Sequence, residues 1–170
     1  FRAGAPKCED GASLLRSPTP GPRLAFKGFV KDRNGNPVSG AEVDVWHSST
    51  VGLYENQDPT QAEMNLRGRF TTLADGSFSF TTVKPAGYPV PTDGPAGALL
   101  AAQGRHNMRP AHLHFLIYKP GFKTIASQVY DPQDPHLETD SQFGVTKALV
   151  GNYKKTRSGF SMSFVFTLEK

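Results

Sequence analysis

Short runs in which apolar and polar residues alternate recur along this chain, and turns rich in Gly and Pro separate them. Alternation with a period of two is typical of a β-strand with one buried face. The 170 residues include 17 Gly and 14 Pro, and sustained helical periodicity is scarce. Short strands joined by many turns need a second layer to cover their apolar faces. The chain is therefore predicted to fold as one all-β domain, an antiparallel β-sandwich with long loops and one or two short helices.

The alternating runs are predicted to pair with their neighbours in sequence, because short turns lie between them. Residues 24–30 and 41–46 flank the turn at residues 34–37 and are interpreted as one hairpin-like unit. Residues 66–73 and 77–82 are interpreted as a second unit of the same kind. Further strands are predicted over residues 112–119, 124–130 and 160–168.

The other segments are interpreted as a lead-in, short helices and loops. Residues 1–23, rich in Gly and Pro, are predicted to form an extended lead-in segment, and residues 24–170 the sandwich domain. Asp93 is expected to cap a short helix that begins at Pro95. A long connection near the C-terminus is expected to contain a helical turn around residues 145–150.

The charge pattern argues against two classes of partner. The net charge is +4, but the Lys and Arg residues are scattered, and no nucleic-acid partner is expected. No apolar run approaches the roughly 18 residues that span a bilayer, so no membrane partner is expected either. Cys8 is the only cysteine, which excludes a disulfide within the chain.

His112 and His114 are the first candidates for a functional site. They stand two apart in a predicted strand, so that their side chains share one face. Two imidazoles at this spacing can bind one metal ion. Taken alone, a His-X-His pair is more often an ordinary surface or hydrogen-bonded pair. The motif by itself leaves both interpretations open.

Tyr54 and Tyr88 each lie where the chain leaves a predicted strand. Tyr88 stands in a proline-containing turn, residues 87–91, which restricts the direction of its side chain at little entropic cost. Tyr54 lies in the loop that follows Trp46. A tyrosine in a loop is usually a packing residue with a hydrogen-bonded hydroxyl. Neither tyrosine taken singly therefore establishes a site.

Several segments of this chain carry a resemblance to one known family, in the family's own order and over nearly the whole length. They are Trp46-His47 with Gly52 and Tyr54, Asn65-Leu66-Arg67-Gly68-Arg69, Gly87-Tyr88-Pro89-Val90-Pro91 with Asp93-Gly94-Pro95, Arg109-Pro110-Ala111-His112-Leu113-His114, Gln128-Val129-Tyr130, His136-Leu137-Glu138-Thr139-Asp140 and Phe143-Gly144-Val145. With these segments the sequence resembles the intradiol ring-cleavage dioxygenases, and among them the branch of catechol and hydroxyquinol 1,2-dioxygenases.

The resemblance implies a role for each matching residue. The iron ligands would be Tyr54, Tyr88, His112 and His114. Arg109 and Gln128 would hold the substrate and its intermediates, and Tyr88 would leave the metal when the substrate binds. The implied reaction consumes O2 and opens a catechol-type ring between its two hydroxyls, which gives a cis,cis-muconate-type diacid.

Charge balance supports Fe(III) as the cofactor. A phenol, whose ordinary pKa is about 10, becomes a good ligand only when the metal ion is acidic enough to remove its proton. Two phenolates and one hydroxide carry three negative charges and neutralise a trivalent ion. Zinc is divalent and would be overcompensated, and its sites favour His, Cys and carboxylates. The resemblance implies the same metal, Fe(III).

Hydroxyquinol (1,2,4-trihydroxybenzene) is the first choice of substrate, because residues 52–59 and 115–122 resemble that subgroup most. Catechol is the second choice and protocatechuate the third. A different class of function is a non-catalytic binding module, because residues 26–45 also resemble transthyretin-like sandwiches. That second resemblance covers one predicted hairpin only. A colourless, iron-free protein that binds a ligand without consuming oxygen would favour it.

The N-terminal residues bear on assembly and location. Many members of the family carry a helical N-terminal region that builds a dimer, and this sequence opens at Phe1-Arg2 inside what resembles the family's entry segment. The N-terminus is therefore expected to be incomplete, and the oligomeric state is left open. A cytoplasmic location is favoured, and secretion is the alternative.

Overall fold

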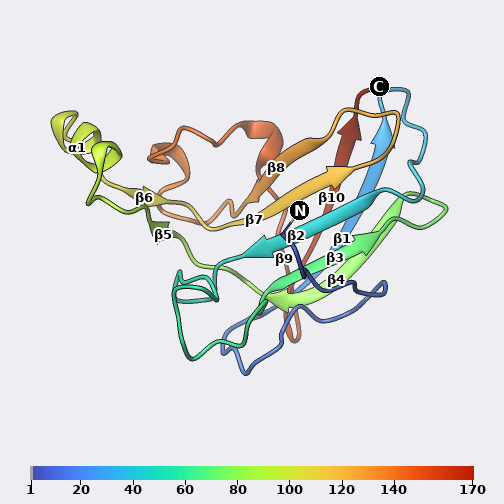
Figure 1. Cartoon of the computed structure of the whole chain (residues 1–170), viewed down its shortest axis with the longest axis horizontal. Coiled ribbons are helices and arrows are strands. Elements are labelled where there is room, and N and C mark those ends of the chain that lie inside the picture. Colours follow the sequence, from blue (N-terminus) through green and yellow to red (C-terminus); the bar gives the residue numbers. More distant parts are fainter. Residues whose placement is uncertain (1) are drawn as a thin grey trace.

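The computed structural model describes residues 2–170 and contains two four-stranded sheets that pack face to face (Figure 1). The first sheet has the order β4 (Ser77–Val83), β1 (Arg23–Asp32), β10 (Gly159–Leu168) and β9 (Lys154–Thr156). The second has the order β3 (Arg67–Thr71), β2 (Glu42–His47), β7 (His112–Tyr118) and β8 (Ile125–Tyr130). A third, short pair consists of β5 (Tyr88–Pro89) and β6 (Met108–Arg109). The predicted sandwich is confirmed.

Alternate residues of both sheets point into one apolar core. In β1, the side chains of Leu24, Phe26 and Val30 are buried, while the residues between them are mostly exposed or half-buried. The rings of Phe26 in β1 and Phe115 in β7 lie 5.1 Å apart, measured between centroids, so they join the two sheets. Burying one such side chain contributes roughly 1.5–3 kcal/mol to folding. The core thus explains why the alternation in the sequence is so regular.

The two predicted hairpins are wrong. β1 pairs with β4 and β10, whereas β2, which follows it, pairs with β3 and β7 in the other sheet. β3 and β4 likewise belong to different sheets. The inward faces of successive strands cover each other across the core, so the turns at residues 34–37 and 74–76 are corners between the sheets. The predicted strands over residues 112–119 and 124–130 do form a hairpin, β7 with β8.

One strand pair departs from the antiparallel prediction. β1 and β10 run parallel over ten register pairs, from Arg23 with Gly159 to Asp32 with Leu168. A long connection after β8 lets the chain enter β10 in the parallel direction, which a tight turn could not do. This connection contains two 3-10 helices, η1 (Leu137–Thr139) and η2 (Lys147–Leu149). The predicted helical turn around residues 145–150 corresponds to η2, whereas η1 and β9 were not predicted.

Residues 2–22 run along one open side of the sandwich, between the edge strands β3 and β4. Their backbone forms hydrogen bonds with β3 at Arg69 and with β4 at Thr81. Leu14 is buried in the core cluster. This segment therefore covers the gap between the two sheet edges. Phe1, the first residue of the predicted lead-in, lies outside the described residues.

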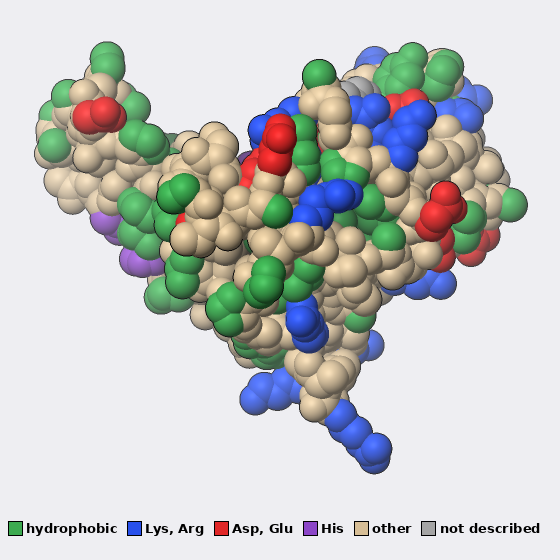
Figure 2. Space-filling view, turned by 60° about the horizontal axis from the view of Figure 1, so that its bottom comes forward, with side chains coloured by type: hydrophobic (Ala, Val, Ile, Leu, Met, Phe, Trp, Pro, Cys, Tyr) green, Lys and Arg blue, Asp and Glu red, His purple; other side chains and the backbone are tan. Residues whose placement is uncertain are grey.

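The helix α1 (Pro95–Ala102) stands at one end of the molecule, beyond β5 and β6 (Figure 1). In the space-filling view it forms an arm with hydrophobic side chains on its surface (Figure 2). The helix begins at Pro95, as predicted. The cap predicted at Asp93 is wrong, because Gly94 is the N-cap residue and no side chain caps the helix. None of the helices within residues 2–170 has the length and apolar composition needed to span a bilayer.

Candidate metal centre

β7 presents His112 and His114 on the face of its sheet that points away from the core. Their neighbour Leu113 fills the core on the opposite face. The Nδ1–H of His112 donates to the carbonyl oxygen of Pro110 at 2.6 Å, which leaves Nε2 with a free lone pair. On the adjacent strand β8, the side-chain amide nitrogen of Gln128 lies 3.2 Å from Nδ1 of His114. Each ring is thus contacted at Nδ1. The Pro110 carbonyl fixes the proton of His112 on Nδ1, whereas the tautomer of His114 depends on which end of the Gln128 amide faces its Nδ1, and Nε2 can bind a metal only when Nδ1 carries the proton.

Tyr88 and Tyr54 reach the same place from two other segments. Tyr88 is the first residue of β5, and its backbone pairs with Arg109 of β6. Tyr54 lies in the loop between β2 and β3. The phenol oxygen of Tyr54 lies 3.0 Å from that of Tyr88 and 3.1 Å from Nε2 of His114. The structure therefore brings together two phenols and an imidazole pair from three distant stretches of sequence.

Four donor atoms meet at one point: the phenol oxygens of Tyr54 and Tyr88 and the Nε2 atoms of His112 and His114. The two Nε2 atoms are 3.0 Å apart, and the Tyr88 oxygen is 3.4 Å from Nε2 of His112. Ligand atoms that bind a metal ion at about 2.0–2.1 Å in a tetrahedral arrangement are about 3.3 Å apart. The set therefore fits one metal ion. Within residues 2–170, no three His, Cys, Asp or Glu side chains are grouped for a metal, so this candidate centre depends on its phenols.

Burial shifts the pKa values of the candidate ligands and so determines which of them are protonated at neutral pH. It lowers the pKa of His112 to about 4, and burial together with the neighbouring His112 lowers the pKa of His114 to about 2. Both imidazoles are therefore neutral at neutral pH and can donate a lone pair to a metal. Burial, with the nearby phenol of Tyr88, raises the pKa of Tyr54. Tyr54 thus keeps its proton until a cation enters the site and favours the phenolate.

Arg109 lies buried beside the four donor atoms. Its Nε and Nη2 donate to the two carboxylate oxygens of Asp140 at 3.2 and 3.3 Å. Nη2 also donates to the hydroxyl of Tyr130 at 2.9 Å and to Oε1 of Gln128 at 3.1 Å, and Nη1 is 3.3 Å from Nε2 of His112. Burial alone would lower the pKa of Arg109, but the hydrogen bonds and charge of Asp140 outweigh it and raise the pKa. The site therefore contains a fixed positive charge.

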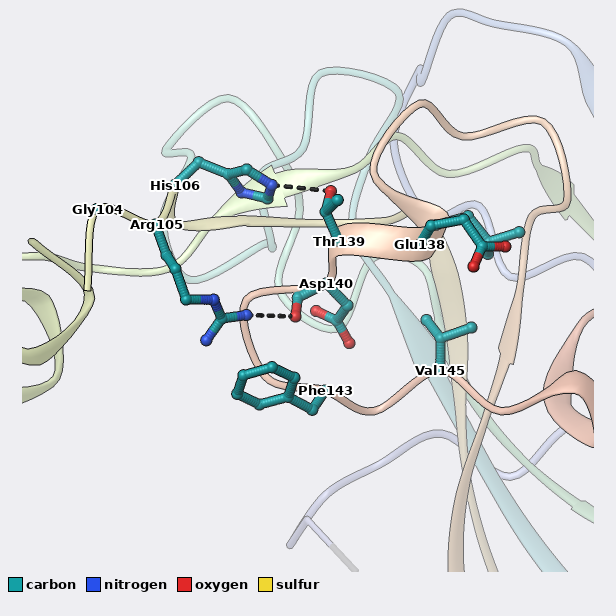
Figure 3. Close-up of a pocket in the computed structure, with 9 residues that line it drawn as sticks. Gly104, Arg105, His106, Glu138, Thr139, Asp140, Phe143 and Val145 are labelled. Atoms are coloured by element: carbon teal, nitrogen blue, oxygen red, sulfur yellow. Dashed lines mark hydrogen bonds between the residues drawn. The ribbon is translucent and has the colours of Figure 1, made fainter.

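The loop that contains Asp140 is held by the segment that follows α1 (Figure 3). Arg105 donates to the backbone oxygen of Asp140 at 3.0 Å. The backbone N–H of Met108 donates to Nδ1 of His106, so Nε2–H of His106 donates to Thr139 Oγ1 at 2.9 Å. A hollow of about 490 Å³ lies between these groups and contains none of the four donor atoms. Arg105 and His106 thus hold the loop of Asp140 in place, and Asp140 in turn pairs with Arg109.

A second cavity, of about 680 Å³, is lined by Tyr88 and lies between α1 and the loop after η1. Its walls are mostly apolar and include Val90, Pro91, Leu99, Leu100 and Phe143. A cleft with apolar walls and a few polar groups at one side is the usual form of a small-molecule site. An aromatic ring in this cavity would lie next to Tyr88, one of the two phenols.

Three residues around the donor atoms were not among the predicted site residues. Tyr130 is buried, as expected of a packing residue, but its hydroxyl also accepts from Arg109. Its position two residues after Gln128 in one strand is a signal that could have placed it on the same face. Trp46 stacks on the ring of His114, and Asp140 pairs with Arg109. No spacing in the sequence indicates the Asp140 contact, because a long loop carries that residue.

The known proteins that this chain resembles in sequence are dioxygenases. A family model described as a dioxygenase matches residues 1–169. The hydroxyquinol 1,2-dioxygenase of Rhizobium sp. (strain MTP-10005) is 40% identical over 154 residues, which cover 90% of this chain and 52% of that protein. The intradiol ring-cleavage dioxygenase prcA of Aspergillus niger is 43% identical over 152 residues, covering 88% of this chain and 48% of that protein. The chain therefore spans about half the length of these relatives.

Solved structures agree over almost all of the chain. The hydroxyquinol 1,2-dioxygenase from Pseudomonas putida DLL-E4 superposes with a TM-score of 0.89 at 36% identity, covering 99% of this chain and 63% of that one. The catechol 1,2-dioxygenase from Pseudomonas arvilla C-1 gives a TM-score of 0.90 at 33% identity, covering 99% and 59%. The likeness thus includes both sheets and the loops between them.

Proposed function

Because this chain belongs to the intradiol ring-cleavage dioxygenase family, we propose that it opens a catechol-type ring between its two hydroxyls with O2 to give a cis,cis-muconate-type diacid. The observation that carries the proposal is the convergence of two phenol oxygens and two imidazole nitrogens at contacts of 3.0 to 3.4 Å. The proposed cofactor is Fe(III), and its ligands are Tyr54, Tyr88, His112 and His114.

The chemistry of the donor set suits this ion. Phenolate is a hard, anionic oxygen donor, and imidazole is a common partner of iron, so the set favours a trivalent metal over zinc. The contacts between the four atoms leave room for one ion at ordinary bond lengths. When bound, Fe(III) would supply a Lewis acid that makes the ring of the diol reactive towards O2.

Tyr54 and Tyr88 have different tasks in this proposal. Tyr88 stands in a strand of two residues and lines the apolar cavity, so it is the phenol that an entering diol meets. Tyr88 would be the ligand that makes room for the substrate, and its phenol oxygen would then hold a proton from a substrate hydroxyl. Tyr54, held between Tyr88 and His114, stays a ligand throughout.

Arg109 and Gln128 act on the substrate side of the site. The guanidinium of Arg109 is permanently charged and held in place by Asp140, so it stabilises negative charge on the diol as the ring becomes reactive. The amide of Gln128 contacts both Nη2 of Arg109 and Nδ1 of His114. Gln128 thereby holds the guanidinium of Arg109 and the imidazole of His114 at a constant distance from each other.

Hydroxyquinol is the proposed substrate, with catechol and then protocatechuate as the alternatives. Two relatives bear the name hydroxyquinol 1,2-dioxygenase, and they are 40% and 36% identical to this chain. Relatives named catechol 1,2-dioxygenase, at 37% and 40% identity, support catechol almost as well.

Oxygen uptake with purified, iron-loaded protein tests the proposal. Hydroxyquinol, catechol, protocatechuate and gallate are compared side by side, and each product is identified by mass. We expect uptake of one O2 per ring opened, fastest with hydroxyquinol, by a protein coloured red by its tyrosinates. Iron-loaded protein that consumes no oxygen with any of the four diols contradicts the proposal. A colourless protein that binds a diol unchanged would instead support the binding module.

The proposed partners are a small aromatic diol and O2. A cytoplasmic location is proposed, with secretion as the alternative.

A further inference from the structure

Four side chains form a row across the outer face of the sheet that carries His114. Arg67 in β3, Trp46 in β2, His114 in β7 and Gln128 in β8 are successive register partners. The indole of Trp46 stacks on the imidazole of His114 with centroids 4.7 Å apart and planes 1° from parallel. The guanidinium carbon of Arg67 lies 5.3 Å from the indole centroid. A cation–π contact of this kind attracts the guanidinium to the ring that packs on His114.

Arg67 also faces the loop of the other candidate ligand. Glu55 directly follows Tyr54. Its Oε1 pairs with Nη1 of Arg2 and also lies 3.9 Å from Nε of Arg67, at ion-pair distance without a hydrogen bond. Asp44 Oδ1 lies 3.9 Å from Nη1 of the same guanidinium. The side chains of Glu55 and Asp44 are only 4% and 1% exposed, and carboxylates buried to this degree need a nearby cation. Arg67 therefore contacts both Trp46, which packs on His114, and Glu55, which belongs to the loop of Tyr54.

We propose that Arg67 is a positioning residue of the metal centre, which orients His114 through the ring of Trp46 and holds the Tyr54 loop through Glu55. The inference rests on the proposed function, since both positioned groups are proposed Fe(III) ligands. Tyr54 and His114 come from segments that share no turn. A group that contacts the supports of both can therefore keep their donor atoms at a constant separation. Residues that hold ligands in this way tune metal affinity without binding the metal.

The test compares Fe(III) affinity, by chelator competition, and the tyrosinate absorption band of the wild type with those of three variants. Arg67→Met keeps an apolar side chain of similar length and removes the charged, planar guanidinium group. Arg67→Lys keeps the charge only, and Trp46→Leu removes the ring between Arg67 and His114. We expect Arg67→Met and Trp46→Leu to bind iron about 10- to 100-fold more weakly, with a changed band. Arg67→Lys should recover part of the affinity, because it restores a cation near Glu55.

Lys84→Met is the matched control. The Nζ of Lys84 pairs with Asp131 at 2.7 Å and lies 5.2 and 4.8 Å from the ring centroids of Tyr153 and Phe160. It is thus another largely covered cation on aromatic rings, but it contacts none of the four proposed ligands. Its loss should lower the melting temperature and leave iron affinity and the absorption band as in the wild type.

The outcomes separate this inference from the proposed function. Wild-type iron affinity and an unchanged band in both Arg67→Met and Trp46→Leu overturn the positioning role while the proposed function stands. The same holds if Lys84→Met weakens iron binding as strongly as they do. Thermal unfolding of the metal-free proteins checks folding, and if Arg67→Met does not fold, Arg67→Lys and Trp46→Leu decide by the same comparison. A wild-type protein that binds no iron overturns both proposals.

Discussion

Tyr54 and Tyr153 are both largely buried phenols, and they differ in what their hydroxyls contact. The Tyr54 oxygen lies within 3.1 Å of both Tyr88 and His114. The Tyr153 hydroxyl is buried without a hydrogen-bond partner in the described part of the chain. Because burial raises the pKa of both, only the neighbours of Tyr54 make it a candidate ligand.

Tyr54→Phe should weaken iron retention and abolish the visible band, because it removes one phenolate donor. Absorption spectra and the iron-to-protein ratio after gel filtration measure both effects. Tyr153→Phe is the control, and it should keep the iron and the band with stability changed by less than about 1 kcal/mol, since no hydrogen bond is lost. An unchanged spectrum in Tyr54→Phe would remove this residue from the proposed ligand set.

Arg109→Ala should retain iron but lower kcat by about 10²–10³-fold, because the residue is assigned to charge on the substrate and not to the metal. The iron content and kcat are measured on the same preparation. The variant should also be less stable by about 3–5 kcal/mol, since Asp140 is left buried without its cation. Arg109→Lys restores a charge and controls for that loss. Loss of iron from both variants would contradict the assignment.

At the scale of loops and strands, the two phenols meet because the loop after β2 packs against the turn before β5. Gly52 lies at the contact with φ +79°, and a Cβ there would come within 2.7 Å of the backbone oxygen of Gly87 and 3.1 Å of Cβ of Tyr88. Gly35 has a similar φ of +84°, but a Cβ there would meet nothing within 4 Å. These glycines share a backbone conformation and differ in their surroundings.

Gly35→Ala should lower stability by about 1–2 kcal/mol, the cost of left-handed backbone for a residue with a Cβ, and Gly52→Ala should lower it further, because its Cβ also meets the backbone oxygen of Gly87. Only Gly52→Ala should also weaken iron binding, because it forces the Tyr54 loop away from Tyr88. Denaturant unfolding of the metal-free proteins and chelator competition measure the two effects separately. Equal iron affinity in the two variants would show that the approach of the loops does not control the centre.

His47, the last residue of β2, links the two sheets. Its Nδ1–H donates to the carbonyl oxygen of Ser48 at 2.7 Å, so Nε2 accepts from the hydroxyl of Thr82 in β4, also at 2.7 Å. Burial lowers the pKa of His47 to about 4. The folded protein therefore holds this histidine neutral, whereas the unfolded chain protonates it near pH 6.5.

Stability should consequently fall as the pH drops from about 6.5 towards 4, because only the unfolded state binds the proton in that range. His47 alone accounts for up to about 3 kcal/mol of this loss, and its contribution is fully present above pH 6.5. Denaturant unfolding at a series of pH values measures the slope. His47→Gln should reduce it, and identical slopes in the two proteins would contradict the assignment.

For the whole molecule, the core and the candidate metal centre are separate. The core cluster of buried residues draws on both sheets and contains none of Tyr54, Tyr88, His112 and His114. His112 and His114 lie on the outer face of one sheet, Tyr54 lies in a loop between two strands of that sheet, and Tyr88 lies in the short strand β5. The fold is therefore expected not to depend on a metal, in contrast to small domains that unfold without one.

Removal of iron by a chelator should leave the far-UV circular dichroism unchanged and lower the melting temperature by roughly 10 °C, the loss expected for a ligand bound well above its Kd. Re-addition of Fe(III) should restore both the melting temperature and the colour. Cooperative loss of strand signal on chelation would contradict the separation of core and centre.

Much of the strand pattern could be predicted from the sequence, because alternation is a local property of the backbone. The strands over residues 112–119, 124–130 and 160–168 follow from it, and so does the shared face of His112 and His114. The identities of the candidate ligands followed from the resemblance of short motifs. Asp93 was misjudged as a helix cap, since a good capping residue one position too early makes no bond to the helix.

Sequence by itself determined where the longer strands form and which residue types could bind a metal, because side-chain type and period are properties of a few neighbouring residues. Only the tertiary structure decided which strands pair, that the turns at residues 34–37 and 74–76 are corners, and that Trp46 and Asp140 support His114 and Arg109. These contacts join segments far apart in the chain, and many pairings compete for the same apolar faces. The choice among them depends on packing of the whole core.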